Sequence, residues 1–266
     1  MRLDRLAAAG LSTLETAVRS GEPVLLGRDL PSRIPMDEIV PFCHAVEDPA
    51  LQCHLAPPAG ESPTKIAVSI VIPTHRQRPI GLNAWAAQDV ETEVLVLANG
   101  TYKEGISVPW AGHGATRNRG WQLAQYPYVL FSVDDALPLG AGFVRTMVEA
   151  LEAGNLDAVT ARQVPWPTSD RVTRARLRDW TPPGPRSSPI LDNVCALYRR
   201  SALESDPFDA VPIAEDWLWG RRHRVGYVPG APVAHAHARR FRALYARTRD
   251  LHREFGRAGE AATVPD

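Results

Sequence analysis

The sequence lacks the features of an extracellular, membrane-spanning or nucleic-acid-binding protein. Its 266 residues include only three cysteines, too few for a disulfide framework and typical of a reducing compartment. No stretch approaches the ~20 apolar residues of a membrane span, and the N-terminus has no apolar signal core. The 30 basic and 30 acidic residues cancel, so net charge indicates no nucleic-acid partner. We therefore expect a cytoplasmic protein.

Composition divides the chain into three parts. Residues 1–64 form an N-terminal extension that contains one expected helix and closes with a proline-rich linker. Residues 65–237 alternate strand and helix signals and form the core. Residues 238–266 are rich in arginine and predict a helix with one apolar face. That helix could contact an anionic membrane peripherally, but we favour packing against the core.

The core predicts an α/β fold with a mostly parallel sheet. Apolar runs predict strands at residues 66–72, 93–98 and 128–133, separated by helices at 81–88 and 112–124. Pro73 is expected to stop the first strand. Alternating strands and helices imply parallel pairing through right-handed crossovers. The carboxyl ends of the three strands should therefore face one crevice.

Two adjacent acids, Asp134 and Asp135, follow the third strand, and Pro138 makes the chain turn just beyond them. Ligands of open α/β sheets bind at the carboxyl ends of strands. Neighbouring carboxylates repel, and a divalent cation would remove that repulsion and leave a site for a diphosphate. The alternative is a turn in which one aspartate bonds the backbone. The two acids alone do not decide between these interpretations.

Several stretches, in order, resemble the family 2 glycosyltransferases. They are residues 69–74, 93–101, 115–120, 131–135, 214–219 and 226–235. Each stretch is weak evidence by itself, but their common order is specific. The resemblance covers residues 66–237 and implies a GT-A fold, a Rossmann-like nucleotide-sugar domain with a mixed, mostly parallel sheet flanked by helices.

The resemblance implies inverting transfer of a sugar from a nucleoside diphosphate to an acceptor hydroxyl, with a divalent metal (Mn²⁺ or Mg²⁺) as cofactor. Asp135 would bind the cation, and His235 is the natural additional ligand. Asp216 would be the general base, although Glu215 and Asp216 could merely cap a helix. His235 could likewise be a buried histidine that bonds only the backbone.

The remaining site candidates fall into two groups. The expected nucleotide-binding residues are Pro73, Thr74, Asn99, Arg117 and Asp134. The expected donor or acceptor pocket contains Arg162, Gln163, Asn193, Glu215, Trp217 and His237. Trp217 and the nearby Trp219 suit a sugar platform and core packing equally.

Two positions depart from the family pattern. Val133 and Ala98 stand where many relatives carry acids near the metal and the nucleotide. Asn99 could pair with a base edge or only form an Asn-Gly turn. The departures keep open a non-catalytic relative that binds a nucleotide sugar. A nucleotidyltransferase is the other alternative, although no Gly-rich, Lys-containing loop follows the first strand.

A finer similarity concerns the substrate. Residues 162–165, 192–200 and 233–237 are similar to bacterial rhamnosyltransferase-like members, which implies a deoxythymidine diphosphate-linked deoxyhexose donor. The acceptor could be a glycan, a lipid-linked molecule or a small molecule. Residues 165–189 are rich in proline and arginine and predict an irregular loop over the donor site.

Overall fold

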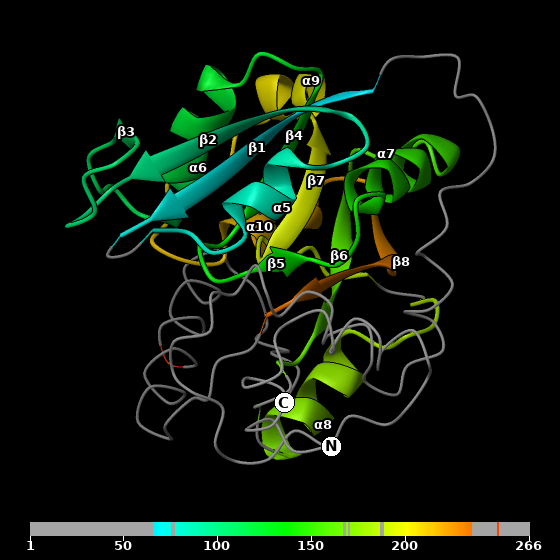
Figure 1. The fold of residues 1–266 in the computed structure, drawn as a ribbon. Coiled ribbons are helices and arrows are strands. Elements are labelled where there is room, and N and C mark those ends of the chain that lie inside the picture. The colour runs from blue at the N-terminus through cyan, green and yellow to red at the C-terminus, as the bar shows by residue number, and fades with distance from the viewer. Residues whose placement is uncertain are drawn as a thin grey trace, which may run out of the picture.

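The computed structural model describes residues 66–75, 78–166, 169, 171–186, 189–235 and 249. These residues form an eight-stranded sheet in the order β3-β2-β1-β4-β7-β6-β8-β5, flanked by helices (Figure 1). The sheet mixes parallel and antiparallel pairs, which confirms the predicted α/β class. The helix expected in the N-terminal extension lies outside the described residues, as does all of residues 238–266 except Arg249.

The elements follow the expected alternation through the first half of the core. The strands are β1 Ala67–Thr74, β2 Glu91–Ala98, β3 Ile106–Ser107, β4 Tyr128–Ser132, β5 Leu137–Pro138, β6 Ala158–Val164, β7 Cys195–Arg199 and β8 Val225–Ala234. The helices are α5 Leu82–Ala86, α6 His113–Leu123, α7 Phe143–Ala153, α8 Arg171–Trp180, α9 Arg200–Ser205 and α10 Glu215–Gly220.

The first three predicted strands are β1, β2 and β4, and β1 pairs in parallel with both others. The expectation that Pro73 stops the first strand is wrong, because β1 continues to Thr74. The Thr74 carbonyl accepts the Asn99 N–H at 3.0 Å, so the backbone groups of Thr74 point towards β2. Backbone groups of successive strand residues point in alternate directions, so the backbone nitrogen of Pro73 points away from β2 and towards β4. The β1–β4 ladder has already ended at Val71, so the proline displaces no ladder hydrogen bond.

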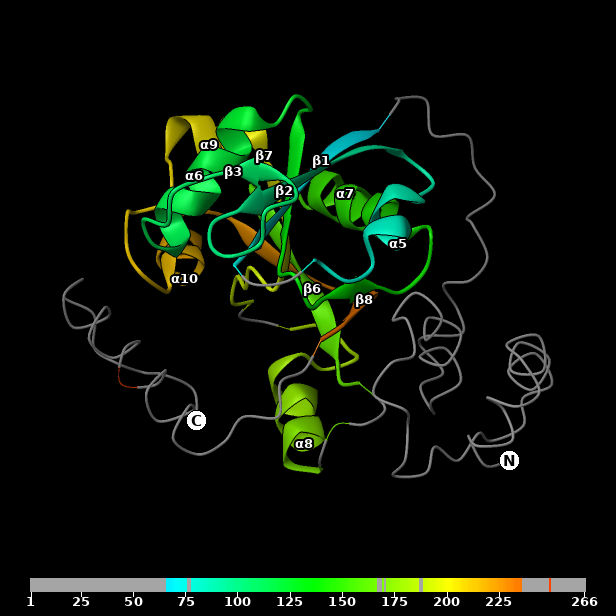
Figure 2. The same ribbon diagram turned by 60° about the vertical axis from the view of Figure 1, so that its left-hand side comes forward.

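Alternating strand residues supply two apolar layers, one on each face of the sheet. Val68, Ile70 and Ile72 pack with Trp85 of α5 and with the apolar side of α7. Val71 packs on the opposite face, with residues of α6, α9 and α10. Figure 2 shows α5 and α7 on one side of the sheet and α6, α9 and α10 on the other. Period-two alternation thus places helices on both faces.

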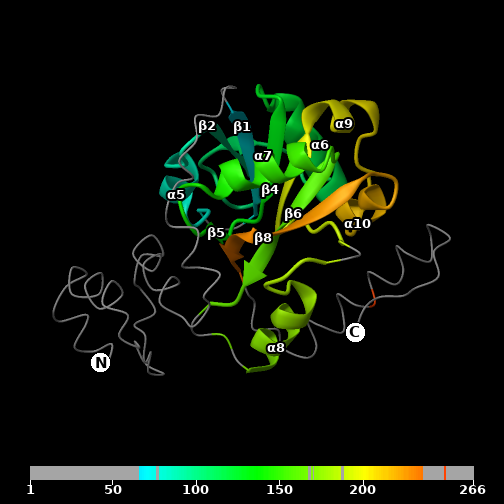
Figure 3. The same ribbon diagram turned by 90° about the vertical axis from the view of Figure 1, so that its right-hand side faces the viewer.

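The sequence predicted an irregular loop over residues 165–189, and this prediction is wrong in part, because the segment contains the helix α8. Thr173 and Leu177, four residues apart, are buried and form the inner stripe of the helix. Arginine is a good helix former, so an Arg-rich helix needs only this narrow apolar stripe. Figure 3 shows α8 beyond the carboxyl end of β6, apart from the helices that flank the sheet.

Within the described ranges, no helix is both long enough and apolar enough to cross a bilayer.

Gly120 lets α6 lie close against the sheet, and we predict that Gly120→Ala destabilises the protein. An added Cβ would stand 2.5 Å from Val71 Cγ1 and 3.1 Å from Leu97 Cδ1. Overpacking of this kind should lower the free energy of unfolding by about 1–3 kcal/mol, measured by urea denaturation. Gly184→Ala is the control, since a Cβ there meets nothing within 4 Å. Equal stability of both variants would contradict the close packing.

Candidate functional site

A pocket of about 440 Å³ lies at the carboxyl ends of β1, β2 and β4. All five residues expected to bind a nucleotide line it: Pro73, Thr74, Asn99, Arg117 and Asp134. The parallel register explains this convergence, because Thr74 lies opposite Ala98 and the acids follow the neighbouring strand. The tertiary structure therefore brings together residues that are up to 61 positions apart, from Pro73 to Asp134.

Short polar contacts fix several residues that line the pocket. Thr74 Oγ1 donates to Asp134 Oδ2 at 2.7 Å, and the Asp134 carbonyl accepts the Ile80 N–H at 2.8 Å. Asn99 is only 7% exposed, and its Oδ1 is buried without a hydrogen-bond partner. A buried acceptor without a partner costs free energy, so a ligand donor at that position would be favoured. Its backbone N–H donates to the Thr74 carbonyl at 3.0 Å, and its role in base pairing stays a prediction.

Sequence reasoning missed several side chains that line the same pocket. Trp110 and His113 lie in edge-to-face contact, with ring centroids 5.4 Å apart, and Trp110 is 54% exposed. His75 and Thr116 also line the pocket. A tryptophan two residues before the glycine that caps α6 was the available signal in the sequence. A large exposed ring at a pocket offers a stacking surface for a planar ligand.

His235 and Asp135, the expected metal ligands, lie together. His235 directly follows β8 and its Nε2 is 3.6 Å from Asp135 Oδ1. Within the described residues, no group of three or more His, Cys, Asp or Glu side chains could hold a metal ion. Ions such as Mg²⁺ commonly take one or two carboxylates from the protein and further ligands from substrate phosphates. The pair therefore fits a site that a bound diphosphate would complete.

Asp216 occupies the first turn of α10 and is half-buried. Its Oδ2 accepts the Asn193 N–H at 2.7 Å, and its Oδ1 accepts the Trp217 N–H at 2.8 Å. Desolvation, followed by the charges of Glu215 and Asp192, raises the pKa of Asp216 to about 7. A carboxylate with such a pKa is a stronger base than an exposed aspartate.

A buried ion pair supports this helix. Arg117 donates to Glu215 Oε1 at 2.7 Å, and the two side chains are 7% and 2% exposed. Asn193 also donates to Glu215 Oε1, at 3.1 Å, and accepts the Tyr198 hydroxyl at 2.7 Å. Glu215 and Asn193, both expected in the donor or acceptor pocket, thus use their side chains to connect α6, β7 and α10.

Backbone strain marks the start of the same helix. Ala214, which precedes the two acids, has φ 72° and ψ 17°, a left-handed conformation that costs a non-glycine residue about 1 kcal/mol or more. Such strain persists where surrounding contacts overdetermine the backbone, and it clusters at functional sites. The strain therefore agrees with a functional role for the turn that carries Asp216.

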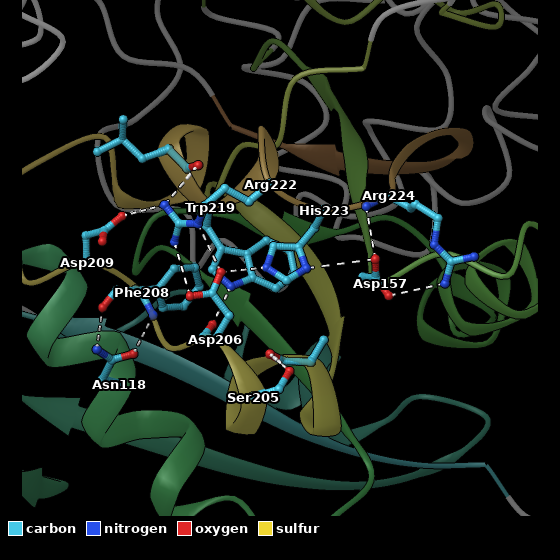
Figure 4. A network of polar contacts seen from close by, with 12 residues as sticks. Asn118, Asp157, Ser205, Asp206, Phe208, Asp209, Trp219, Arg222, His223 and Arg224 are labelled. Atoms are coloured by element: carbon cyan, nitrogen blue, oxygen red, sulfur yellow. Dashed lines mark hydrogen bonds and ion pairs between the residues drawn. The ribbon is translucent and has the colours of Figure 1, made fainter. Parts of the chain in front are cut away.

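A polar network holds the far end of α10 (Figure 4). Trp219 Nε1 donates to the Asp206 carbonyl at 2.6 Å, and His223 stacks on the Trp219 ring at 3.6 Å. Asp206 also contacts His223 Nε2 at 2.8 Å and Arg222 Nε at 3.0 Å. Trp219 is fully buried, so it serves core packing and not a sugar platform.

The remaining residues expected in the donor or acceptor pocket differ in how deeply they are buried. Trp217 is partly buried and lies under the Arg221 guanidinium, 5.1 Å from the ring centroid. Arg162 and Gln163 are buried in β6, 7% and 5% exposed. His237 lies outside the described residues.

No known family model matches the chain, and no curated protein matches it. Solved structures do match. A mannosyltransferase from Pyrobaculum calidifontis, in complex with GDP-Man and Mn²⁺, is 16% identical with a TM-score of 0.59, covering 96% of this chain and 78% of that one. Glucosyl-3-phosphoglycerate synthase from Mycobacterium tuberculosis, in complex with Mg²⁺ and UDP, is 19% identical with a TM-score of 0.52, covering 74% and 81%.

A TarS fragment from S. aureus also matches, at 17% identity and a TM-score of 0.47, covering 64% of this chain. The chain spans only 60% of the length of that fragment. At these identities the similarity shows the fold alone, which is GT-A: a Rossmann-like, curled mixed sheet flanked by helices.

We predict that Arg117→Met lowers the free energy of unfolding by about 3–5 kcal/mol, because it leaves the buried Glu215 carboxylate without its cation. Urea denaturation measures the change. Arg145→Met is the matched control, since Arg145 bonds Asp89 at 2.9 Å with both side chains partly exposed. Removing that pair should cost about 0–1 kcal/mol. Similar losses in the two variants would contradict a structural role for the Arg117–Glu215 pair.

Proposed function

We propose that the protein is a metal-dependent, inverting glycosyltransferase that moves a sugar from a nucleoside diphosphate to an acceptor hydroxyl. One observation carries the proposal: a chain of contacts joins the expected metal ligands to the expected base. His235 Nδ1 contacts Gln163 Oε1 at 3.1 Å, Gln163 Nε2 donates to Asp192 Oδ2 at 2.7 Å, and the next residue, Asn193, donates to Asp216. These groups therefore share one region beside the nucleotide pocket.

The pocket supplies contacts that suit a nucleotide. The Trp110 ring would stack on the base, and Asn99 Oδ1 would accept a base N–H. The Asp134 carboxylate, fixed by the Thr74 hydroxyl, would bond the ribose hydroxyls. Asp135 and His235 would hold Mn²⁺ or Mg²⁺, which when bound neutralises the leaving diphosphate. The structural neighbours solved with GDP-Man and Mn²⁺, and with UDP and Mg²⁺, support this assignment.

Asp216 would accept the proton of the acceptor hydroxyl as that oxygen attacks the anomeric carbon. Attack from the face opposite the leaving diphosphate inverts the anomeric configuration. A pKa of about 7 lets Asp216 be ionised near neutral pH and still bind a proton readily. Two backbone N–H donors hold its carboxylate in place for this step.

The finer substrate assignment rests on the similarity of residues 162–165 and 192–200 to rhamnosyltransferase-like sequences. We accordingly propose a deoxyhexose such as rhamnose as the donor sugar, with a glycan, lipid-linked or small-molecule acceptor. The few cysteines support a cytoplasmic location. Peripheral membrane contact through residues 238–266 remains a proposal on sequence grounds alone, as do the roles of Arg162, Trp217 and His237.

We predict that Asp216→Asn abolishes sugar transfer without abolishing donor binding. Thermal shifts with a panel of nucleoside diphosphates and Mn²⁺ first identify the nucleotide, because a ligand of the native state raises Tm. Turnover of the matching nucleotide sugars is then measured as nucleoside diphosphate release. The variant should lose about 10²–10⁴-fold in kcat because it lacks the base, with donor affinity nearly unchanged.

Three outcomes would contradict the proposal in different ways. Donor binding by the wild-type protein without any turnover would favour a non-catalytic nucleotide-sugar-binding relative. Release of pyrophosphate would instead favour a nucleotidyltransferase. Full turnover by the Asp216→Asn variant would remove this residue as the base.

We also predict that kcat of the wild-type enzyme falls as the pH is lowered through about 7, because protonated Asp216 cannot accept another proton. Desolvation raises the pKa of Asp216 most, and Glu215→Gln removes the neighbouring charge that contributes most after it. Ionised Asp216 then becomes less unfavourable, its pKa falls, and the acidic limb of the pH–rate profile should move to lower pH. An unmoved limb would show that another group controls it.

A further inference from the structure

We infer that Gln163 is a positioning residue that sets which nitrogen of His235 carries the proton, and that Asp192 sets the orientation of Gln163. The inference rests on the proposed metal site, and it extends that site to two residues behind the expected ligands. Gln163 was expected only in the donor or acceptor pocket, and Asp192 was not selected from the sequence.

Asp192 can only accept hydrogen bonds when it is ionised. Its Oδ1 accepts the Val194 N–H at 2.9 Å, and its Oδ2 accepts Gln163 Nε2 at 2.7 Å and Trp180 Nε1 at 3.4 Å. These donors fix the carboxylate. Because an ionised carboxylate repels an amide oxygen, the Gln163 amide must present its NH₂ group to Asp192.

The opposite end of the same amide then determines the histidine tautomer. With its nitrogen on Asp192, Gln163 presents Oε1 to His235 Nδ1, 3.1 Å away. An oxygen acceptor there requires a proton on Nδ1. A neutral imidazole with Nδ1–H has its lone pair on Nε2, the nitrogen that faces Asp135 Oδ1 at 3.6 Å.

That arrangement suits a metal ligand. Two electron-rich atoms, His235 Nε2 and Asp135 Oδ1, face each other beyond hydrogen-bond distance. A cation bound by both would remove their repulsion. Histidine ligands commonly donate their other N–H to an oxygen that fixes the tautomer and the ring orientation.

Backbone contacts hold Gln163 and His235, two members of the Asp192–Gln163–His235 relay, beside each other. β6 and β8 run parallel, with Gln163 opposite Val233 and Val164 opposite Ala234. The His235 N–H donates to the Val164 carbonyl at 2.9 Å, and Thr181 Oγ1 donates to the Gln163 carbonyl at 2.8 Å. Both side chains are about 5% exposed, so water does not compete for their contacts.

The test compares Gln163→Met and Asp192→Asn with the wild-type protein. Histidine ¹⁵N NMR shows which ring nitrogen carries the proton, and a His235→Ala sample identifies the signal. Mn²⁺ affinity is measured separately, with the metal alone, from the electron paramagnetic resonance signal of the unbound ion. Gln88→Met is the matched control, because Gln88 also bonds through both ends of its amide, but to the backbone of Ala84 and Val144.

We expect the wild-type His235 to carry its proton on Nδ1. Gln163→Met should abolish that preference and weaken Mn²⁺ binding about 10-fold or more. Asp192→Asn should turn an NH₂ group towards Gln163, reverse that amide, and move the His235 proton to Nε2. Gln88→Met should change neither the tautomer nor Mn²⁺ affinity, even if it lowers Tm.

Failure of the inference and failure of the metal site are distinguishable. A wild-type protein that binds no Mn²⁺, either alone or with the nucleoside diphosphate that thermal shifts identify, would overturn the metal site, and with it the role of Gln163. Normal wild-type binding with an unchanged tautomer and affinity in Gln163→Met would overturn only the relay. A proton on Nε2 of His235 in the wild-type protein would also overturn it.

Discussion

The candidate site depends on gathering three carboxylates, those of Asp192, Glu215 and Asp216, near one buried guanidinium. Arg117 neutralises Glu215 directly, whereas Asp192 and Asp216 are held by backbone and side-chain N–H donors. Desolvation raises the pKa of Asp216 most, and the negative charges of Glu215 and Asp192 raise it further, to about 7. The same cluster of charged groups thus supports α10 and sets the proton affinity of Asp216, so a substitution that alters one should alter the other.

The sheet topology explains how that cluster meets the pocket. β1, β2 and β4 are parallel, so their carboxyl ends form the candidate pocket. β7 runs antiparallel to β4, with Cys195 opposite Ser132. The residues just before β7, Asp192 and Asn193, therefore lie near the acids that follow β4. The change from parallel to antiparallel pairing joins the two halves of the site.

Much of the fold could be read from the sequence, because its signals are local. Apolar runs marked β1, β2 and β4, and the paired acids marked the end of the third. The errors arose where context overrides a local rule. Pro73 remains in a strand because it lies past the end of a ladder. α8 forms in a stretch that reads as irregular, because two buried residues suffice to anchor it.

The sequence by itself determined the order of the first strands and helices of the core and placed the paired acids after a strand, since these follow from apolar periodicity and turn residues; His235 was selected through the family resemblance. Only the tertiary structure decided that Arg117 pairs with Glu215, that Trp110 lines the candidate pocket, and that Gln163 links His235 to Asp192. These contacts join residues distant along the chain. Strand register and helix packing select their partners, and no local pattern encodes them.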